Sequence, residues 1–382
     1  MNQHFPEKMT GKTRLSGRQA RILVAPLDWG LGHATRCIPV IRELIAQGAQ
    51  VWLAGEGAQE KLLKEEFPDL PFLPLQGYRI RYAGSASGLV WNMFRQLPKM
   101  KKAIEYENNW LKKVVREYRP DAVISDNRYG LYHPDIPSVI ITHQLLIKTG
   151  WGKWSERILQ LRNYAYLNRF NHCWIPDEEG KGNLAGELSH PDKKPIPPVR
   201  YIGFLSRFSK LQLPERKDHL LLLLSGPEPQ RSLLENLLIA GLGDHNGTAT
   251  VVRGLPGEHS LIPSTNRVQF YNHLQATALN KEMQEASLII CRSGYSSIMD
   301  ALALEKKCIL VPTPGQTEQE YLGSTLMERG IAVTVAQKEF SLKKALALAA
   351  AFNYTFPPAG NGSGLSEAVK TLLHQVAGAA LG

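Results

Sequence analysis

Short apolar runs recur along the first half of the chain, with amphipathic stretches between them. Arg21–Pro26 and Gln50–Ala54 are almost continuously apolar, which is typical of parallel strands covered on both faces. Between them, the apolar positions of Ile38–Ile45 repeat with the period of a helix. Asp121–Ser125 and Ser138–Thr142 repeat the strand pattern after a long amphipathic stretch. This alternation predicts a doubly wound sheet with helices on both faces.

The same alternation begins again after a segment that is rich in glycine, proline and charge. That segment, Glu178–Lys217, has the composition of a domain boundary. We therefore predict an α/β protein of two doubly wound, Rossmann-like domains facing a central cleft, which also fits the length of 382 residues. In chain order, the predicted parts are a flexible N-terminal arm (1–18), a first domain (19–200), a linker (201–217), a second domain (218–352) and a C-terminal linker with a last helix (353–382).

The amino-acid composition limits the expected localisation of the protein and the classes of molecule that it binds. Apolar residues make up 43% and charged residues 21%, and no apolar run approaches the roughly 20 residues that span a bilayer. The polar N-terminus lacks the apolar centre of a secretion signal, and the four cysteines form no paired motif, so we expect a cytoplasmic protein. The net charge of +10 favours anionic partners. Nucleic acid ranks last among them, because no nucleic-acid-binding motif is evident.

A glycine-rich turn after the first strand carries the first candidate chemistry. Asp28–Arg36 places Gly30 and Gly32 where a tight turn is needed, and the helix that follows offers free N–H groups to an anion. His33 lies at this helix start, where the positive dipole keeps an imidazole neutral, as a general base requires. Arg36 follows it. The alternative interpretation of His33 is a histidine that caps or packs the helix.

Two further strand ends in the first half supply polar side chains. Asp126 and Asn127 follow one buried strand, and His143 follows the next. We expect Asp126 to orient His33 or an acceptor hydroxyl, and His143 to bind acceptor or phosphate. An Asx turn and a strand cap are the structural alternatives.

A loop rich in serine and glycine is the candidate phosphate site of the second half. It follows a buried strand and opens a helix, so its amides and hydroxyls suit a diphosphate; its residues are Ser293, Gly294, Tyr295, Ser296 and Ser297. Arg292 is close enough in sequence to help. Asp300 lies about one helical turn past Ser296 and is placed to accept hydrogen bonds from ribose hydroxyls. The alternative is an N-cap serine with a solvated aspartate.

The next loop, together with the start of the helix after it, is the predicted binding site for the donor sugar. Gln316, Gln319 and Glu320 follow a proline-rich loop and combine donors and acceptors for sugar hydroxyls. The alternative is an ordinary polar first turn, where the helix dipole favours acidic residues.

These motifs together resemble a known family. Ala286–Gly330, with R-S-G, an aspartate six positions past that glycine, V-P-T-P and a closing E-R-G, resembles the C-terminal donor domain of MurG-like glycosyltransferases. By this resemblance Asp300 stands at a ribose-binding acidic position, and Gln319 with Glu320 stands where the family contacts the donor sugar. The N-terminal G-L-G-H-A-T-R is similar to the family's glycine-rich loop, so that His33 falls on its histidine.

The resemblance implies a GT-B enzyme that moves a sugar from a UDP-sugar co-substrate to a lipid-linked or small-molecule acceptor. Such an enzyme would serve the cell envelope from the cytoplasmic face of the membrane. We expect inverting transfer with His33 as base, and no cofactor or metal, because no D-x-D motif or His/Cys cluster is present. One departure lies in Leu224–Arg231, which contains Gly226 but also two prolines that cannot donate; Arg231 is expected to compensate with charge.

Three alternatives stay open. The G-x-G-H-x-x-R-C pattern with Arg36 and Cys37 is also similar to the nucleotide-sugar hydrolase of pseudaminic acid synthesis, in which water replaces the acceptor. A non-catalytic nucleotide-sugar sensor or partner subunit is the alternative of another class. Gly88–Lys102 interleaves large apolar residues with lysines, as a peripheral contact with an anionic membrane would, although a packed helix with snorkelling lysines has the same pattern.

Overall fold

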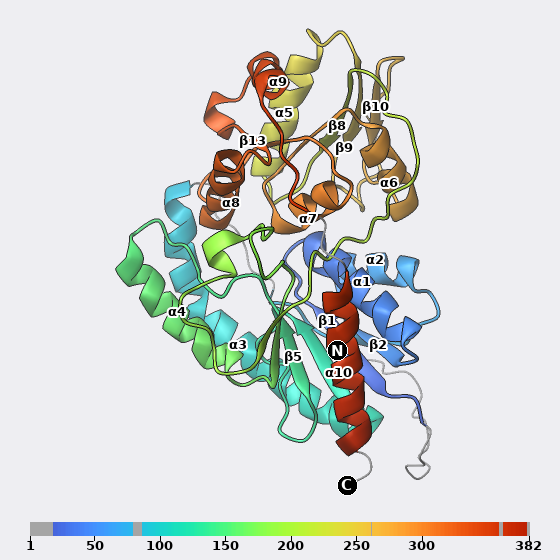
Figure 1. Cartoon of the computed structure of the whole chain (residues 1–382), viewed down its shortest axis with the longest axis vertical. Coiled ribbons are helices and arrows are strands. Elements are labelled where there is room, and N and C mark those ends of the chain that lie inside the picture. Colours follow the sequence, from blue (N-terminus) through green and yellow to red (C-terminus); the bar gives the residue numbers. More distant parts are fainter. Residues whose placement is uncertain (1–17, 79–85, 261, 359–361, 380–382) are drawn as a thin grey trace. The chain divides into compact units, whose positions relative to one another are not determined.

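The computed structural model describes residues 18–78, 86–260, 262–358 and 362–379, except the side chains of residues 86–97. The chain forms two compact units (Figure 1). The first consists of the described residues up to 78, Arg95–Leu205 and the C-terminal helix, and the second consists mainly of residues 206–358. The division between Leu205 and Ser206 lies inside the segment that the sequence pattern indicated as a linker.

The first unit is built on a seven-stranded parallel sheet in the order β3-β2-β1-β4-β5-β6-β7. Val24 and Ile124, on neighbouring strands, are completely buried, as expected for a sheet covered on both faces. The order of the strands reverses between β1 and β4, which is the switch point where such sheets bind ligands. The strands are β1 Arg21–Pro26, β2 Gln50–Gly55, β3 Phe72–Pro74, β4 Ala122–Asp126, β5 Ser138–Ile141, β6 His172–Ile175 and β7 Val199–Tyr201.

Helices of the first unit follow the amphipathic stretches of the sequence. They are α1 Leu31–Ala46, α2 Gly57–Glu66, α3 Ala86–Tyr118, α4 Lys153–Leu167 and α10 Ser363–Ala379, with a short 3-10 helix at Gly186–Leu188. The sequence pattern did not predict α4, β6 or β7, and β7 lies inside the proline-rich segment that we interpreted as a boundary. None of the described helices is long and apolar enough to cross a membrane. In the segment Gly88–Lys102, a candidate membrane contact, the side chains up to residue 97 lie outside the described residues, and Lys101 and Lys102 are exposed on α3.

Helix α10 belongs to the first unit. It packs against α1 and β7, where Nε2 of Gln47 donates to the carbonyl of Ser366 at 2.9 Å and the His172 ring bonds Gln375 at 2.8 Å. Its buried face consists of Ala368, Val369, Leu372 and Val376. The last helix is therefore part of the first core, although the whole second unit precedes it in the sequence.

The second unit contains a six-stranded parallel sheet in the order β10-β9-β8-β11-β12-β13. Here the order reverses between β8 and β11. The strands are β8 His219–Leu223, β9 Thr248–Val252, β10 Val268–Tyr271, β11 Leu288–Cys291, β12 Cys308–Leu310 and β13 Val333–Thr334; the helices are α5 Gln230–Leu242, α6 Ala276–Glu285, α7 Tyr295–Ala303, α8 Thr317–Glu328, α9 Leu342–Ala351 and a 3-10 helix at Gln337–Glu339.

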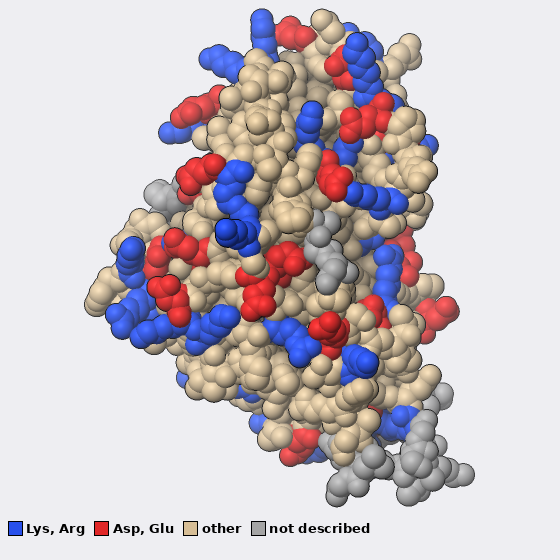
Figure 2. Space-filling model, in the orientation of Figure 1, with Lys and Arg blue, Asp and Glu red and all other residues tan. Residues whose placement is uncertain are grey.

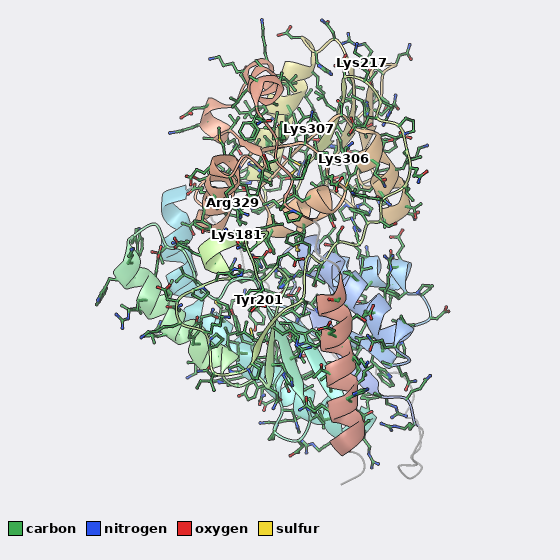
Figure 3. All side chains as sticks on the ribbon, in the orientation of Figure 1. Lys181, Tyr201, Lys217, Lys306, Lys307 and Arg329 are labelled. Carbon is green, nitrogen blue, oxygen red and sulfur yellow. The ribbon has the colours of Figure 1, made fainter. Side chains whose placement is uncertain are left out.

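Polar side chains fasten loops to each unit (Figure 3). In the first unit, the Tyr201 hydroxyl donates to the Ser189 carbonyl at 2.9 Å, and its ring stacks on His190. In the second unit, Lys306 is only 4% exposed; its Nζ donates to the Gln284 carbonyl at 3.0 Å and pairs with Glu215. Contacts of this kind provide hydrogen-bond partners for buried polar groups that lie outside the sheets.

Candidate functional site

The candidate site of the first unit lies at the switch point of its sheet. Pro26 at the end of β1 is paired with Asp126 at the end of β4, and Asp126 is paired with Ile141 at the end of β5. The glycine turn follows β1, with Gly30 at a φ of 72°, and places His33 in the first turn of α1. Parallel strand ends therefore bring together residues that are about a hundred positions apart in sequence.

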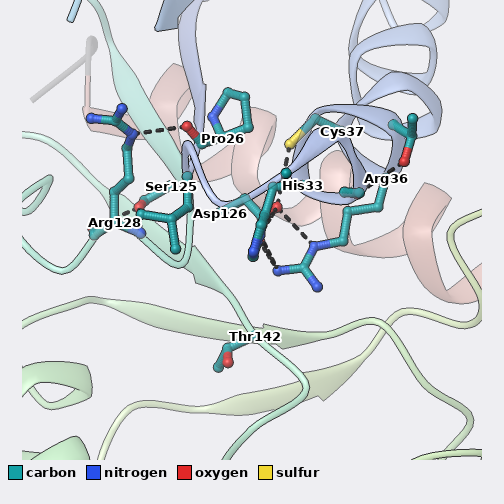
Figure 4. Close-up of polar contacts among 12 residues, drawn as sticks. Pro26, His33, Arg36, Cys37, Ser125, Asp126, Arg128 and Thr142 are labelled. Carbon is teal, nitrogen blue, oxygen red and sulfur yellow. Dashed lines mark hydrogen bonds and ion pairs between the residues drawn. The ribbon is translucent and has the colours of Figure 1, made fainter. Parts of the chain in front are cut away.

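The carboxylate of Asp126 binds three side chains of α1 (Figure 4). Arg36 donates to it through Nε at 2.7 Å and through Nη2, and Nδ1 of His33 lies 3.1 Å from Oδ2. The Cys37 thiol lies 3.9 Å from the same oxygen. His33, Arg36 and Cys37 are three and four residues apart, which places them on one face of the helix. The structure thus brings the predicted base and its predicted orienting residue into contact.

The electrostatics of this cluster favour an ionised aspartate and a neutral histidine. Burial alone would raise the pKa of Asp126, but Arg36 and His33 act against burial and the net direction is down. Burial and then the Arg36 guanidinium lower the pKa of His33, although Asp126 acts in the opposite direction. Burial, followed by the charge of Asp126, raises the pKa of Cys37, which therefore stays a thiol.

The tautomer of His33 decides whether it is able to accept a proton at Nε2. Nδ1 faces an acceptor, Asp126 Oδ2 at 3.1 Å, and a donor, Arg36 Nη2 at 2.9 Å, and satisfies one of them at a time. With the proton on Nδ1, the ring donates to Asp126 and Nε2 keeps its lone pair. With the proton on Nε2, the ring accepts from Arg36 and is not a base at that nitrogen.

His143 and Asn127 complete the same edge. Nη1 of Arg36 donates to Nδ1 of His143 at 3.2 Å, and His143 is 4% exposed, so it joins the cluster through the arginine. Asn127 adopts a φ of 56° directly after Asp126, and its Oδ1 is buried without a hydrogen-bond partner in the described part of the chain. Both residues lie where the sequence pattern predicted them, at the ends of β5 and β4.

The sequence pattern did not predict the buried side chains that hold the loops of this edge in place. Gln59 on α2 is 3% exposed, and its Nε2 donates to the Leu27 carbonyl and to the Gly30 carbonyl at 3.1 Å, which fixes the glycine turn. A lone glutamine in an amphipathic helix carries no sequence signal for this role, because only the tertiary fold brings it to the turn.

A buried ion pair holds the turn that follows Asp126. Arg128 and Glu107, both 0% exposed, pair at 2.9 Å, and Nε of Arg128 donates to the Pro26 carbonyl at 2.8 Å. The Tyr78 hydroxyl donates to Glu107 at 2.8 Å. Burial raises the pKa of Glu107 to about 7, although Arg128 acts in the opposite direction. These contacts join α3, the segment after β3 and the end of β4 into one rigid support.

In the second unit, several predicted donor residues meet beyond the ends of β11 and β12, and β11 borders the switch point with β8. Ser293 Oγ donates to the Gln319 carbonyl at 2.8 Å, and Oε1 of Gln319 accepts from the Thr313 amide at 2.9 Å. Nε2 of Gln319 donates to Oε1 of Gln316 at 2.5 Å. The structure therefore brings together the serine loop and the start of α8, through residues that are 26 positions apart.

The other predicted donor residues lie around the same edge. Gly226 follows β8 with a φ of 103°, and Gly294 is the N-cap of α7. Ser296 and Ser297 are partly exposed in the first turn, whereas Tyr295 is 3% exposed and packs into the unit. Glu320 accepts from the Gly315 amide at 3.0 Å. The start of α7 thus presents amides and hydroxyls at the edge where parallel sheets bind anions.

Asp300 is 9% exposed and already has a protein partner. The Ser206 hydroxyl donates to its Oδ1 at 2.7 Å. Burial raises the pKa of Asp300 to about 6, although Arg207 and Ser206 act in the opposite direction. The sequence pattern predicted a carboxylate open to ribose hydroxyls, and here one of its oxygens is engaged by the chain itself.

Arg292 and Arg231 differ from the expectation that they supply charge to a diphosphate. Arg292 is 1% exposed, and its guanidinium donates to backbone carbonyls of the neighbouring loops; these are Gln230 at 2.5 Å, Val311 at 3.1 Å and Pro312 at 3.2 Å. Arg231 is 5% exposed and pairs with Glu228 at 2.5 Å and Glu235 at 2.9 Å. Both guanidinium groups are occupied within the unit, because a buried cation requires partners. Sequence proximity did not indicate which way these side chains point.

No three His, Cys, Asp or Glu side chains meet as a metal site would require, within the residues that the structure describes. The four cysteines are all buried and free.

Comparison with known sequences finds similar proteins over most of the chain. Residues 261–368 match the sequence model of the glycosyltransferase family 28 C-terminal domain. The UDP-N-acetylglucosamine--N-acetylmuramyl-(pentapeptide) pyrophosphoryl-undecaprenol N-acetylglucosamine transferase of Pasteurella multocida is 23% identical over 358 residues, covering 89% of this chain and 90% of that protein. An uncharacterized glycosyltransferase of Methanosarcina mazei is 21% identical over 326 residues, covering 81% and 84%.

Solved structures share the fold at lower identity. The glycotransferase of kitacinnamycin superposes with a TM-score of 0.59 at 15% identity, covering 95% of this chain and 96% of that one. MurG of Acinetobacter baumannii superposes with a TM-score of 0.51 at 15% identity, covering 94% and 99%. At these identities the comparison shows the fold, which is that of a two-domain, Rossmann-like GT-B protein.

Proposed function

We propose that this chain, a MurG-like GT-B glycosyltransferase, transfers a sugar from a UDP-linked donor to an acceptor hydroxyl, with His33 as the general base. The observation that carries the proposal is the contact between His33 and the buried, ionised Asp126 at the switch point of the first sheet. A neutral imidazole held by a carboxylate is the arrangement that proton abstraction from a hydroxyl requires.

The reaction proceeds as a single displacement. Nε2 of His33 takes the hydroxyl proton while the acceptor oxygen forms a bond to the anomeric carbon. The bond from that carbon to the diphosphate oxygen breaks, and the nucleotide diphosphate leaves with the electron pair. Because the acceptor attacks opposite the leaving group, the configuration at the anomeric carbon is inverted.

In this mechanism, Asp126 and Arg36 control the tautomer and the charge of His33. The reaction requires the tautomer in which Nδ1 donates to Asp126, because only that tautomer leaves a lone pair on Nε2. The negative charge of Asp126 also stabilises the imidazolium that forms. Arg36 keeps Asp126 ionised, as the downward shift in the pKa of Asp126 indicates.

The second unit is proposed to hold the donor. The start of α7, from Ser293 to Ser297, offers amides and the positive helix end to the diphosphate, which stabilises the leaving group without a metal. Gln316, Gln319 and Glu320 are proposed to contact the sugar. Asp300, which already accepts from Ser206 and Arg207, is proposed to lie beside the ribose.

The first unit is proposed to hold the acceptor. The Oδ1 atom of Asn127 supports this, because it is a buried acceptor without a hydrogen-bond partner in the described residues and follows Asp126 directly. His143 is the second proposed contact. The Pasteurella multocida relative acts on a pyrophosphoryl-undecaprenol substrate, so a lipid-linked acceptor is the first class to test. A cytoplasmic enzyme that visits the membrane would reach it.

One rival activity shares the same cluster. Arg36 and Cys37 both contact Asp126, and they belong to the pattern that is similar to a nucleotide-sugar hydrolase. The purified chain should therefore be incubated with UDP-sugars, with and without a polyprenyl-diphosphate-linked sugar, while UDP release is measured. Transfer predicts release only with the acceptor, and hydrolysis predicts equal release in water alone. Binding seen by thermal shift without any release would indicate a sensor and contradict the proposal.

Substitution of His33 tests the base directly. We expect His33→Ala and His33→Asn to lower the turnover number by about 100- to 10,000-fold, because neither side chain accepts a proton at neutral pH. Donor binding, measured by thermal shift, should remain. His374→Ala is the matched control, because His374 is exposed on α10. Turnover that survives in both His33 variants would rule out this assignment.

A further inference from the structure

Two helices begin at the switch point of the second sheet. Strands β8 and β11 are paired there, with Leu223 opposite Cys291; α5 follows the first of these strands and α7 follows the second. Nη2 of Arg292, directly after β11, donates at 2.5 Å to the carbonyl of Gln230, the first residue of α5. The loops after the two strands are therefore in contact. The proposed function assigns the diphosphate to the start of α7, and a second helix start lies beside it.

The start of α5 is already occupied by a carboxylate of the chain itself. Glu228, two residues before the helix begins, accepts from Nε of Arg231 at 2.5 Å and from the Ser232 amide at 3.2 Å. Pro227 and Pro229, on either side of it, have no N–H to donate. The helix amide and the guanidinium are the groups of this loop that suit a phosphate oxygen, and both bind Glu228 instead.

The charges around Arg231 offset one another. Arg231 also pairs with Glu235 at 2.9 Å, and Glu235 pairs with Arg253 at 2.6 Å, so that two guanidinium groups face two carboxylates. Burial alone would raise the pKa of Glu228, but hydrogen bonds from Arg231 and Ser232 act against burial and the net direction is down. Glu228 is therefore ionised at neutral pH, and Arg231 brings no net positive charge to this edge. The upper part of Figure 2, where Figure 1 labels α5 and α9, likewise mixes basic and acidic side chains.

A buried hydroxyl faces the same loop from the segment after β12. Thr313 is 2% exposed, and its Oγ1 has no hydrogen-bond partner in the described part of the chain. It lies opposite Gly226, where an added Cβ atom would stand 3.9 Å from Oγ1. Gln319, a proposed contact of the donor sugar, accepts from the Thr313 amide at 2.9 Å. A buried hydroxyl without a partner points to a ligand group between these two loops.

A nucleotide sugar and the nucleoside diphosphate that it leaves behind differ in charge at the terminal phosphate. In the nucleotide sugar this phosphate carries one negative charge, because the sugar esterifies it. In the free nucleoside diphosphate the same phosphate has a second ionisable oxygen with a pKa of about 6, so its charge approaches −2 above neutral pH. A carboxylate near the terminal phosphate therefore repels the product more strongly than the donor.

We propose that Glu228 is a specificity-determining residue of the donor site, which repels the free terminal phosphate of the nucleoside diphosphate and so favours the nucleotide sugar over the product. The inference rests on the proposed function, because it takes the start of α7 as the diphosphate site. It deepens that function by giving the loop of residues 224–229 a role in the release of the product.

Calorimetric titration of the full chain with UDP and with the methyl ester of its terminal phosphate tests the proposal. The ester has the charge of a UDP-sugar, and its binding does not depend on which sugar the protein accepts. Because the repulsion scales with the charge of the terminal phosphate, we expect Glu228→Gln to tighten binding of the ester by about threefold and of UDP by about tenfold at about pH 8. Glutamine keeps an oxygen for Arg231 and for the Ser232 amide, so the loop keeps its hydrogen bonds.

The matched control is Glu305→Gln, which removes the same charge beyond the C-terminal end of α7. The Glu305 side chain is 53% exposed, as is that of Glu228, and it pairs with Lys210 at 2.6 Å. Both dissociation constants of this variant should equal those of the wild type. Glu228→Ala is a second neutral variant and should shift the ratio of the two constants in the same direction as Glu228→Gln. Thermal unfolding checks that each variant is folded.

The outcomes separate this inference from the proposed function. If the wild type binds both ligands and the ratio of their dissociation constants is unchanged in both Glu228 variants, Glu228 does not discriminate between them and the proposed function stands. An equal change of the ratio in Glu305→Gln would also overturn the inference, because the effect would then follow from the net charge of the unit. Failure of the wild type to bind either ligand would contradict the proposed donor site, and the inference with it.

Discussion

At the scale of single residues, the chemistry converges on Asp126. Its carboxylate is completely buried and receives His33, Arg36 and Cys37 from one face of α1. Removing a charge of this kind from water is costly, and the bidentate arginine offsets that cost. Burial, followed by the same arginine, lowers the pKa of His33, so the cluster keeps its histidine neutral and its aspartate ionised at the same pH.

The pH dependence of kcat/KM tests whether His33 is neutral while Asp126 is ionised. The pKa of His33 is lowered, so the base is neutral over a wider range and the acid limb of kcat/KM should lie below the usual imidazole pKa of about 6.5. Asp126→Asn removes the group that raises the pKa of His33, so the acid limb should move further down while the turnover number falls. An acid limb that moves up in this variant would contradict the arrangement.

At the scale of elements, the support behind Asp126 depends on α3. Glu107 on this helix binds Arg128 in the turn after β4, and Tyr78 binds Glu107 from the segment after β3. None of these residues belongs to a recognisable motif. Sequence reasoning identified α3 only as an amphipathic stretch, because the pairing of a buried acid with a buried base depends on tertiary contacts.

A double-substitution cycle tests the importance of this pair. Glu107→Leu alone should lower the free energy of unfolding by about 3–5 kcal/mol, because Arg128 stays buried without its partner. Glu107→Leu/Arg128→Met should be less destabilised than the single variant, because no unpaired charge remains. Urea unfolding measures both, and strictly additive effects would indicate that the two side chains act independently.

At the scale of the whole molecule, the C-terminal helix completes the first core although it follows the second unit in sequence. Val369 and Leu372 of α10 are 0% and 2% exposed and belong to the surface that packs on the first unit. Contacts between residues that are distant in sequence are typical of domains that a chain leaves and re-enters.

Truncation of the α10 side chains should therefore affect one unit more than the other. We expect Leu372→Ala to destabilise the first unit by about 2–5 kcal/mol, since it leaves a cavity. Hydrogen exchange should become faster in β1 and β4 but not in β8 and β11. Lys370→Ala, at an exposed position of the same helix, is the control and should exchange like the wild type. Equal acceleration in both sheets would contradict the assignment of α10 to the first core.

Most strands of the two parallel sheets could be predicted from the sequence, because buried strands need continuous apolar runs and their helices need an amphipathic period, whereas β6 and β7 could not. The sequence also determined the loops of His33 and Ser293, because glycine and serine turns at strand ends have a local pattern. The directions of the Arg292 and Arg231 side chains, the packing of α10 and the exposed face of α4 became known from the folded structure. Those features depend on contacts between distant segments, and no local pattern records them.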